Sequence, residues 1–374
     1  MSVQALRAGT LAVAGLTPLS AQAAWELNMP SGVTEMSQDI YGLHMTILGI
    51  CVVIGIVVFG AMFWSILAHR KSKGAKPAHF HESTTVEILW TLIPFLILVG
   101  MAIPATATLL DMYNTDKADV RVKITGYQWK WHYQYLDDDF GFFSNIATAQ
   151  DEIDNLSPKS EHYLRDVDEP LVIPVGKKVE FLMTSNDVIH SWWVPDLGVK
   201  KDAIPGFVNK AWAKVEEPGV YRGQCAELCG RLHGFMPIVV KAVPQDEYKT
   251  FVAKRQEAAE KERMLTEKDW SRDELVERGE KVYASNCAAC HQPDGNGMPP
   301  SFPALNGSAV ATGDPQEHMN TVVNGRSGTA MQAFGKQLSE VDLAAVITYE
   351  RNAWGNKTGD KVTPQQIVEF MKEE

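Results

Sequence analysis

The sequence predicts a multidomain protein that combines a two-helix transmembrane hairpin, an all-β domain and an all-α domain. Two long stretches near the N-terminus are apolar and free of Asp, Glu, Lys and Arg. Residues 120–243 contain short runs of alternating β-branched and aromatic side chains, separated by Pro and Gly turns. From residue 273 onward the pattern becomes helical. A chain of 374 residues is long enough for two or three domains.

The membrane hairpin is predicted from the two uncharged stretches, residues 45–68 and 88–110. Each is long enough to cross a hydrocarbon core of about 30 Å, which takes about 20 helical residues. We expect helices at about residues 43–68 and 87–111, within an N-terminal region of residues 24–118. Cys51 lies in the first helix, where we expect a small packing residue.

An export signal is predicted before the hairpin. Residues 1–23 contain Arg7, a short apolar run and a small-x-small cleavage site, which is typical of a secretory signal peptide and too short for a third span. The segment between the two spans is basic and contains Arg70, Lys71, Lys73 and Lys76. The positive-inside rule places this segment in the cytoplasm. We therefore expect a multi-pass protein of the bacterial inner membrane, with both termini and both domains on the periplasmic or outer side.

The boundaries of the domains follow from changes in composition. Residues 119–244 predict a compact antiparallel sandwich or barrel. Residues 245–272 are rich in Glu, Lys, Arg and Ala, which predicts a charged helical linker that is poorly suited to a core. Residues 273–374 form the predicted helical domain. The formal net charge of −11 disfavours nucleic acid as a partner and favours a basic or neutral one.

The helical domain contains a haem attachment motif. Residues 287–291 are Cys-Ala-Ala-Cys-His, in which Cys287 and Cys290 can form thioethers to haem c and His291 can bind the iron. For the distal ligand we favour Met331, which lies in a Gly-bounded loop before a final helix. Met298 and Met319 are expected to be packing residues. Ligation by His and Met is typical of electron transfer.

A second cluster of metal-binding side chains lies in CAELCGRLHGFM, residues 225–236. An exported pair of cysteines forms a disulfide by default, but this pair is accompanied by His233 and by His190 from an earlier segment. Two thiols and two imidazoles are commonly a structural zinc site. The thioether of Met236 favours copper, because it is a soft ligand. The residues alone leave zinc and copper open.

The chain resembles subunit II of haem-copper cytochrome c oxidases, in the variant with a cytochrome c domain at the C-terminus. The likeness is carried by both spans and by YQWKWHYQY, IHSWWVPDLGVKKDAIPGF, CAELCGRLHGFMPI, NCAACH, GNGMPPSFPAL and MQAFG. It implies a cupredoxin-like Greek-key barrel and a class I cytochrome c fold. It also implies a binuclear copper centre, CuA, with the ligands His190, Cys225, Glu227, Cys229, His233 and Met236.

The resemblance also implies individual roles for these residues. Cys225 and Cys229 would bridge the two coppers, and Glu227 would provide its backbone carbonyl. The side chain of Glu227 would face a magnesium ion shared with subunit I. Trp129 would cover the copper centre where electrons arrive, or else it belongs to the packing face of a strand. Glu87 would lie at the cytoplasmic mouth of a proton path, or else it completes a capping box that begins at Thr84.

The sequence therefore predicts the electron-accepting subunit of a proton-translocating terminal oxidase. Electrons would pass from a c-type cytochrome or the quinol-oxidising complex to haem c, to CuA and then to subunit I, which reduces dioxygen. Subunits I and III are the expected partners, and this chain has no oxygen-reducing site of its own. Two alternatives are weaker. A nitrous-oxide reductase is disfavoured by the two spans and the lack of a His-rich second copper site, and a tethered copper carrier is disfavoured by the haem motif.

Overall fold

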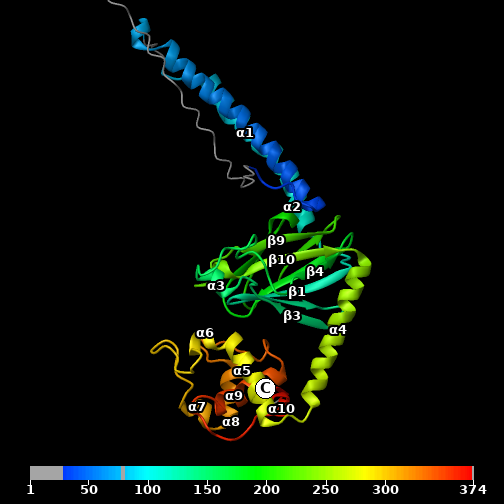
Figure 1. Cartoon of the computed structure of the whole chain (residues 1–374). Coiled ribbons are helices and arrows are strands. Elements are labelled where there is room, and N and C mark those ends of the chain that lie inside the picture. Colours follow the sequence, from blue (N-terminus) through cyan, green and yellow to red (C-terminus); the bar gives the residue numbers. More distant parts are fainter. Residues whose placement is uncertain (1–27, 77–80, 373–374) are drawn as a thin grey trace, which may run out of the picture.

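The computed structural model describes residues 28–76 and 81–372, so the predicted signal peptide lies outside the described residues. Figure 1 shows a helical hairpin, a β domain and a small helical domain in succession, with one long helix running alongside from the β domain to the helical domain. The predicted fold class is confirmed.

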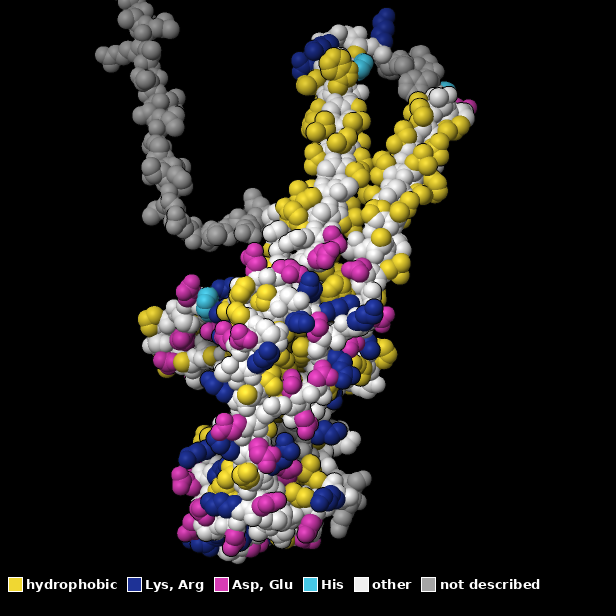
Figure 2. Space-filling model, turned by 90° about the vertical axis from the view of Figure 1, so that its right-hand side faces the viewer, with side chains coloured by type: hydrophobic (Ala, Val, Ile, Leu, Met, Phe, Trp, Pro, Cys, Tyr) yellow, Lys and Arg dark blue, Asp and Glu magenta, His cyan; other side chains and the backbone are white. Residues whose placement is uncertain are grey.

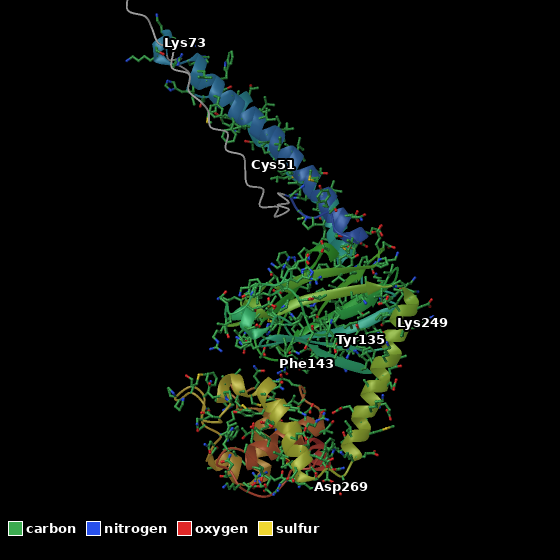
Figure 3. The ribbon with its side chains drawn as sticks, in the orientation of Figure 1. Cys51, Lys73, Tyr135, Phe143, Lys249 and Asp269 are labelled. Carbon is green, nitrogen blue, oxygen red and sulfur yellow. The ribbon has the colours of Figure 1, made fainter. Side chains whose placement is uncertain are left out.

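The hairpin consists of α1 (Glu35–Ala68) and α2 (Thr84–Met112), both apolar and long enough to cross a membrane. Their hydrophobic side chains are exposed, as Figure 2 shows, which suits a surface that meets lipid or another subunit. A basic turn that includes Lys73 joins their far ends (Figure 3). Cys51 is exposed on α1, so its expected packing role is not fulfilled within this chain.

The start of α1 is anchored on the β domain. The helix begins at Glu35, before the predicted start near residue 43, because Thr34 and Ser37 form a capping box. The Thr34 hydroxyl also donates to the carbonyl of Leu197 at 3.0 Å, and Thr34 forms a β-bridge with Val215. The hairpin is therefore joined to the β domain at α1 as well as through the chain after α2.

The β domain contains two five-stranded sheets. The first has the order β3 (Phe140–Ser144), β2 (Lys130–Tyr135), β1 (Val120–Tyr127), β5 (Lys178–Ser185) and β8 (Asn209–Lys214). The second has the order β4 (Leu171–Pro174), β10 (Pro237–Val243), β9 (Gly219–Cys225), β6 (His190–Val194) and β7 (Val199–Ala203). The expectation of purely antiparallel strands is wrong, because β1 pairs with β5 and β4 pairs with β10 in parallel.

Short helices complete this domain: α3 (Gln150–Ile153) and the 3-10 turns η2 (Pro195–Leu197) and η3 (His233–Phe235). Side chains from both sheets form one core. Trp131, Phe181 and Trp192 are fully buried in it, and burying each ring contributes roughly 2–3 kcal/mol. The indole of Trp192 donates to the hydroxyl of Tyr133 at 3.3 Å, so these two polar groups of the core are paired with each other.

The linker is one helix, α4 (Gln245–Glu267), that contacts both domains. Contrary to the expectation of a helix unsuited to a core, Tyr248 is buried in the core of the β domain and Phe251 packs against it. At the other end, the carboxylate of Glu262 accepts hydrogen bonds at 2.8 Å from Arg278 and from Ser339. Helix α4 thus packs on the β domain at one end and is hydrogen-bonded to the helical domain at the other (Figure 1).

The helical domain comprises α5 (Arg272–Asn286), α6 (Ala288–His291), α7 (Ala309–Thr312), α8 (Pro315–Asn324), α9 (Glu340–Asn352) and α10 (Pro364–Lys372). Helices α5 and α9 cross closely at Gly279, where a β-carbon would lie 2.1 Å from the carbonyl oxygen of Ala345. Any other residue there would push the two helices apart.

Candidate metal centres

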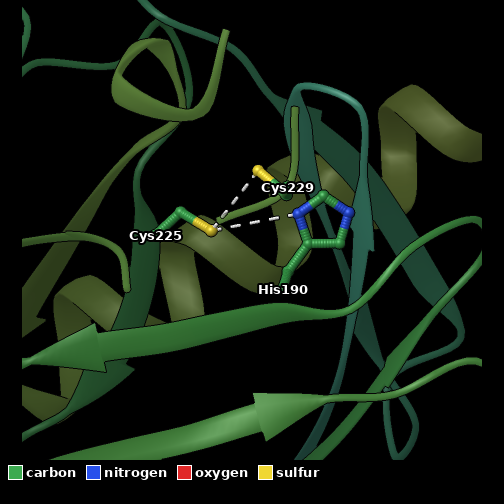
Figure 4. A group of neighbouring side chains, drawn as sticks. All are labelled: His190, Cys225 and Cys229. Carbon is green, nitrogen blue, oxygen red and sulfur yellow. Dashed lines mark hydrogen bonds between the residues drawn. The ribbon is translucent and has the colours of Figure 1, made fainter. Parts of the chain in front are cut away.

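The copper-type donors predicted from the sequence converge at one end of the β domain. His190 begins β6, Cys225 ends β9 and Cys229 lies in the loop that follows. The two sulfurs are 3.8 Å apart, and the Nδ1 atom of His190 lies 3.9 Å from Cys225 Sγ (Figure 4). All three residues are buried, and their donor atoms lie within 4.8 Å of one another. The thiols are free and not a disulfide.

The remaining predicted ligands extend this group from the other side of Cys229. The Nδ1 atom of His233 and the Sδ atom of Met236 each lie 3.5 Å from Cys229 Sγ. The carbonyl oxygen of Glu227 lies 3.4 Å from Cys225 Sγ, while its side chain is exposed. The structure therefore brings all six predicted donor residues into one continuous cluster.

The orientation of His190 is fixed by a carboxylate that the sequence did not reveal. Its Nε2 atom is 2.8 Å from Asp187 Oδ1, which leaves Nδ1 facing Cys225. A metal-binding imidazole is commonly oriented by a carboxylate on its other nitrogen. The short separation of Asp187 from His190 in the sequence was the available signal. Asp187 also accepts a hydrogen bond at 2.7 Å from the backbone N–H of Gln128.

The pKa values of the two thiols are shifted in opposite directions. Burial raises the pKa of Cys225, but hydrogen bonds with His190 and with the backbone outweigh it and lower the pKa to about 7. Burial, together with the charge of Cys225, raises the pKa of Cys229 to about 12. Both sulfurs therefore ionise near neutral pH only when a cation lies between them. A bound metal would supply that charge.

The donor set fits copper better than zinc. A structural zinc site uses four ligands, whereas this cluster contains two thiols, two imidazoles, a thioether and a carbonyl oxygen. The thioether belongs to Met236, which is 2% exposed and lies beside Cys229. A buried soft donor in that position favours copper, and the extra donors suit two ions that share the thiolates.

Trp129 lies over the copper-ligand loop. Its indole N–H donates to the carbonyl oxygen of Cys229 at 3.2 Å, and its ring is only partly buried. It packs against the core of the β domain, as the second interpretation expects, and it also contacts the loop that carries Cys229.

The haem-binding motif is arranged to hold an iron ligand. His291 is 9% exposed, and its Nδ1 atom is 2.9 Å from the carbonyl oxygen of Pro303. A hydrogen bond donated from Nδ1 leaves the Nε2 atom available for iron. Cys287 and Cys290 are free and partly buried beside it. Pro303 is another residue that the sequence did not mark, because it contributes only a backbone atom.

The three candidate methionines occupy different surroundings. Met331 is half-buried in the loop after α8, and its carbonyl oxygen accepts a hydrogen bond at 3.0 Å from Arg326 N. Met319 is 1% exposed within the core of the helical domain, which fits the expected packing role. Met298 is 38% exposed, so its expected packing role is wrong. Burial in the core disfavours Met319 as an iron ligand, and Met331 remains the predicted distal ligand.

Glu87 lies in the first turn of α2 and is exposed. The capping box from Thr84 is wrong, because the helix starts at Thr84 and its N-cap is Ser83, without a side-chain cap. Within the described residues the Glu87 carboxylate makes no hydrogen bond or ion pair. It is available to a partner subunit.

Comparison with known families divides the chain into three matched regions. Residues 22–107 match the transmembrane domain of cytochrome c oxidase subunit II, and residues 120–243 match its periplasmic domain. Residues 274–349 match the family "cytochrome c oxidase, cbb3-type, subunit III". A probable cytochrome c oxidase subunit 2 of Rickettsia bellii is 37% identical over 235 residues, which are 63% of this chain and 86% of that protein. This chain belongs to the cytochrome c oxidase subunit II family.

Other proteins of the subunit II family are 36–40% identical to this chain over the regions that they share with it. Subunit 2 of Cereibacter sphaeroides is 37% identical over 58% of this chain and 75% of that protein. Subunit 2 of Arabidopsis thaliana is 36% identical over 64% of this chain and 92% of that protein. The crystallised periplasmic domain of subunit II from Bradyrhizobium japonicum is 40% identical, with a TM-score of 0.35, over 38% of this chain and 98% of that domain.

Membership in this family has direct consequences for the chain. It is a membrane protein and a partner of subunit I in a haem-copper oxidase complex. Its subunit II domain implies CuA copper, and its cytochrome c domain implies haem. Together these domains give the chain an electron-transfer role in the oxidase.

Proposed function

We propose that this chain accepts electrons on haem c and passes them through a binuclear CuA centre to subunit I, which reduces dioxygen to water and translocates protons. The donor is a c-type cytochrome or the quinol-oxidising complex. Subunit III completes the proposed complex in the bacterial inner membrane. The observation that carries the proposal is the continuous cluster of six copper-type donors beside a motif for covalent haem.

In the proposed site each residue has one role. Cys225 and Cys229 would share the two coppers through their thiolates, and His190 and His233 would each hold one of them. The Met236 thioether and the Glu227 carbonyl complete the set. When bound, copper and haem c each take up and release one electron.

The surrounding protein keeps these ligands in place. Asp187 holds the ring of His190 through Nε2, and the indole of Trp131 donates to the carbonyl of Met236 at 3.3 Å. His190 is fully buried and Cys229 is 2% exposed, so water has little access to these two ligands. A rigid, dry site changes little when its charge changes, which favours rapid electron transfer.

On the haem side, Cys287, Cys290, His291 and Met331 are proposed to bind one haem c. Pro303 keeps the Nδ1 proton of His291 in place. Trp129, which covers the Cys229 carbonyl, is proposed as the point where electrons reach the copper site.

Two further roles are proposed at the boundary with subunit I. The carboxylate of Glu227 is proposed to contribute to a magnesium site shared with that subunit. The backbone carbonyl of this residue faces Cys225, while its side chain is exposed and can reach a partner. The exposed carboxylate of Glu87 lies at the cytoplasmic mouth of a proton path. Consistent with these roles, the basic turn between α1 and α2 is proposed to face the cytoplasm and both domains the outer side.

The experiment that tests the proposal is metal and haem analysis of the purified chain, together with its absorption spectrum. We expect haem c bands, a near-infrared band from mixed-valence copper and two coppers per haem. A single zinc in place of copper would overturn the proposal. The isolated chain should accept electrons and consume no oxygen, so oxygen uptake by it would also contradict the proposal.

A further inference from the structure

A direct hydrogen bond joins the helical domain to the β domain beside both candidate metal sites. The Nε2 atom of Gln332 donates to the carbonyl oxygen of Gln128 at 3.2 Å, across 204 residues of sequence. Gln332 immediately follows Met331, and Gln128 immediately precedes Trp129. One bond thus links the loop of the proposed distal haem ligand to the strand end that covers the copper site.

On the copper side, Gln128 contacts the surroundings of two ligands. Its side-chain Nε2 donates to the carbonyl oxygen of Cys229 at 2.8 Å. Its backbone N–H donates at 2.7 Å to Asp187, which in turn orients His190. A displacement of Gln128 would therefore change the positions of both Cys229 and His190.

On the haem side, the amide of Gln332 is held in one orientation. Its Oε1 atom accepts a hydrogen bond at 3.3 Å from Nε2 of Gln337, which is 6% exposed. Gln337 is itself fixed, because the same nitrogen donates to the carbonyl of Ala333 at 2.7 Å. The NH2 group of Gln332 is left to point at the β domain. A donor fixed in advance loses little entropy when it binds.

Electrostatic neighbours agree with this arrangement. Lys130 of the β domain is close enough to Cys287, and Arg231 close enough to Cys290, for an electrostatic interaction across the domain boundary. Both haem-attachment cysteines therefore lie close enough to the β domain to sense its charges. Together with the contacts of α4, this keeps the haem motif beside the copper-ligand loop.

We propose that Gln332 is a positioning residue that holds the haem domain on the copper domain, and that the path Met331, Gln332, Gln128, Cys229 couples the two metal sites for electron transfer. This inference rests on the proposed function. The transfer oxidises ferrous haem by one electron and reduces the copper centre by one, while no bond is broken and no proton moves. Covalent and hydrogen-bonded atoms lead continuously from the residue of the haem ligand to the residue of the copper ligand.

The test uses the complete oxidase carrying Q332E, Q332A or the control Q316E. Q332E keeps the shape of the side chain and removes the N–H donor. Q316E makes the same change of charge at an exposed position on α8, away from the interface. Absorption spectra of haem and copper establish that both sites are intact in each variant.

Two measurements follow, the rate of haem-to-copper electron transfer after flash reduction of the haem, and backbone amide exchange in residues 126–132 and 225–236. Loss of one hydrogen bond of about 1 kcal/mol changes the ratio of docked to undocked domains by about fivefold. Amide exchange follows the undocked population, so we expect it to be about fivefold faster in Q332E and Q332A. We expect haem-to-copper transfer to be slower in both variants, because the hydrogen bond from Gln332 to Gln128 is a step of the proposed path. Q316E should behave like the parent in both measurements.

The Q332E variant also provides a rescue. At about pH 5 a fraction of the introduced carboxyl groups is protonated and can donate a hydrogen bond again. Transfer in Q332E should therefore be closer to the parent rate at about pH 5 than at about pH 8. Parent-like rates and exchange in both Gln332 variants would overturn the inference and leave the proposed function intact. If the parent oxidase itself showed no haem-to-copper transfer, the proposed function would fail. Loss of haem or copper in both variants would show that Gln332 maintains a metal site and does not hold the two domains together. That result would also overturn the inference.

Discussion

Gly126 lies directly against the imidazole of His190, and a β-carbon at Gly126 would come within 2.8 Å of the ring atom Cδ2. The two residues belong to different sheets, at the end of β1 and the start of β6. The space left by the missing side chain allows His190 to lie between Asp187 and Cys225.

Replacing Gly126 with alanine should therefore displace a copper ligand. We expect Gly126→Ala to lower copper content and to cost about 1–3 kcal/mol of stability from overpacking. The matched control is Gly234→Ala, next to His233, where a β-carbon meets no atom within 4 Å. Metal analysis and chemical denaturation check both variants. Full copper occupancy in Gly126→Ala would show that His190 tolerates the shift.

The copper site should be separable from the haem site. Cys229→Ser removes the sulfur that contacts Cys225, His233 and Met236, so we expect loss of copper and of the near-infrared band. Haem bands should be unchanged, because Cys287 and Cys290 are in the other domain. Cys51→Ser, at the exposed thiol of α1, should retain both cofactors. Retention of two coppers by Cys229→Ser would contradict the proposed ligand set.

The methionines should respond differently to leucine. Met331→Leu removes the proposed distal thioether, so we expect loss of the sulfur-to-iron absorption and a lower haem potential. Met319→Leu should leave the spectrum unchanged and cost less than about 1.5 kcal/mol, because the swap conserves volume in a core. The spectrum of ferric haem distinguishes the variants. An unchanged spectrum in Met331→Leu, with a changed one in Met298→Leu, would reassign the ligand.

The lowered pKa of His132 leads us to expect a smaller free energy of unfolding in acid. Burial, and then the charges of Lys123 and Lys130, lower the pKa of His132 to about 4. The unfolded chain, in which the pKa is near its ordinary value of 6.5, binds the proton more readily. The stability contribution is therefore complete above about pH 6.5 and is lost as the pH falls through about 4.

The measurement is the free energy of unfolding between these pH values. His132→Gln should show a flatter decline than the parent, because its side chain binds no proton. His69→Gln, at an exposed position after α1, is the control and should follow the parent. Equal slopes for all three proteins would show that His132 is not the group that titrates.

The sequence determined the features that depend on neighbouring residues. Uncharged length identifies a span because lipid offers no partner for charge, and Cys287, Cys290 and His291 reach one haem because they lie within a single turn. Cys225, Cys229 and His233 are likewise close along the chain. These parts of the fold and of the candidate sites were predicted from local spacing.

Tertiary structure decides how distant groups meet. The sequence placed His190 in the copper site, but the 35 residues between it and Cys225 gave no geometry, which the packing of the two sheets supplies. Gln128 and Gln332 are 204 residues apart, and only the packing of the domains brings them together. Gly126 and Pro303 act through an absent side chain and a backbone oxygen, which leave no chemical signature in a sequence. Helix α4 contacts both domains because the surfaces that bury Tyr248 and bind Glu262 exist only once both domains have folded.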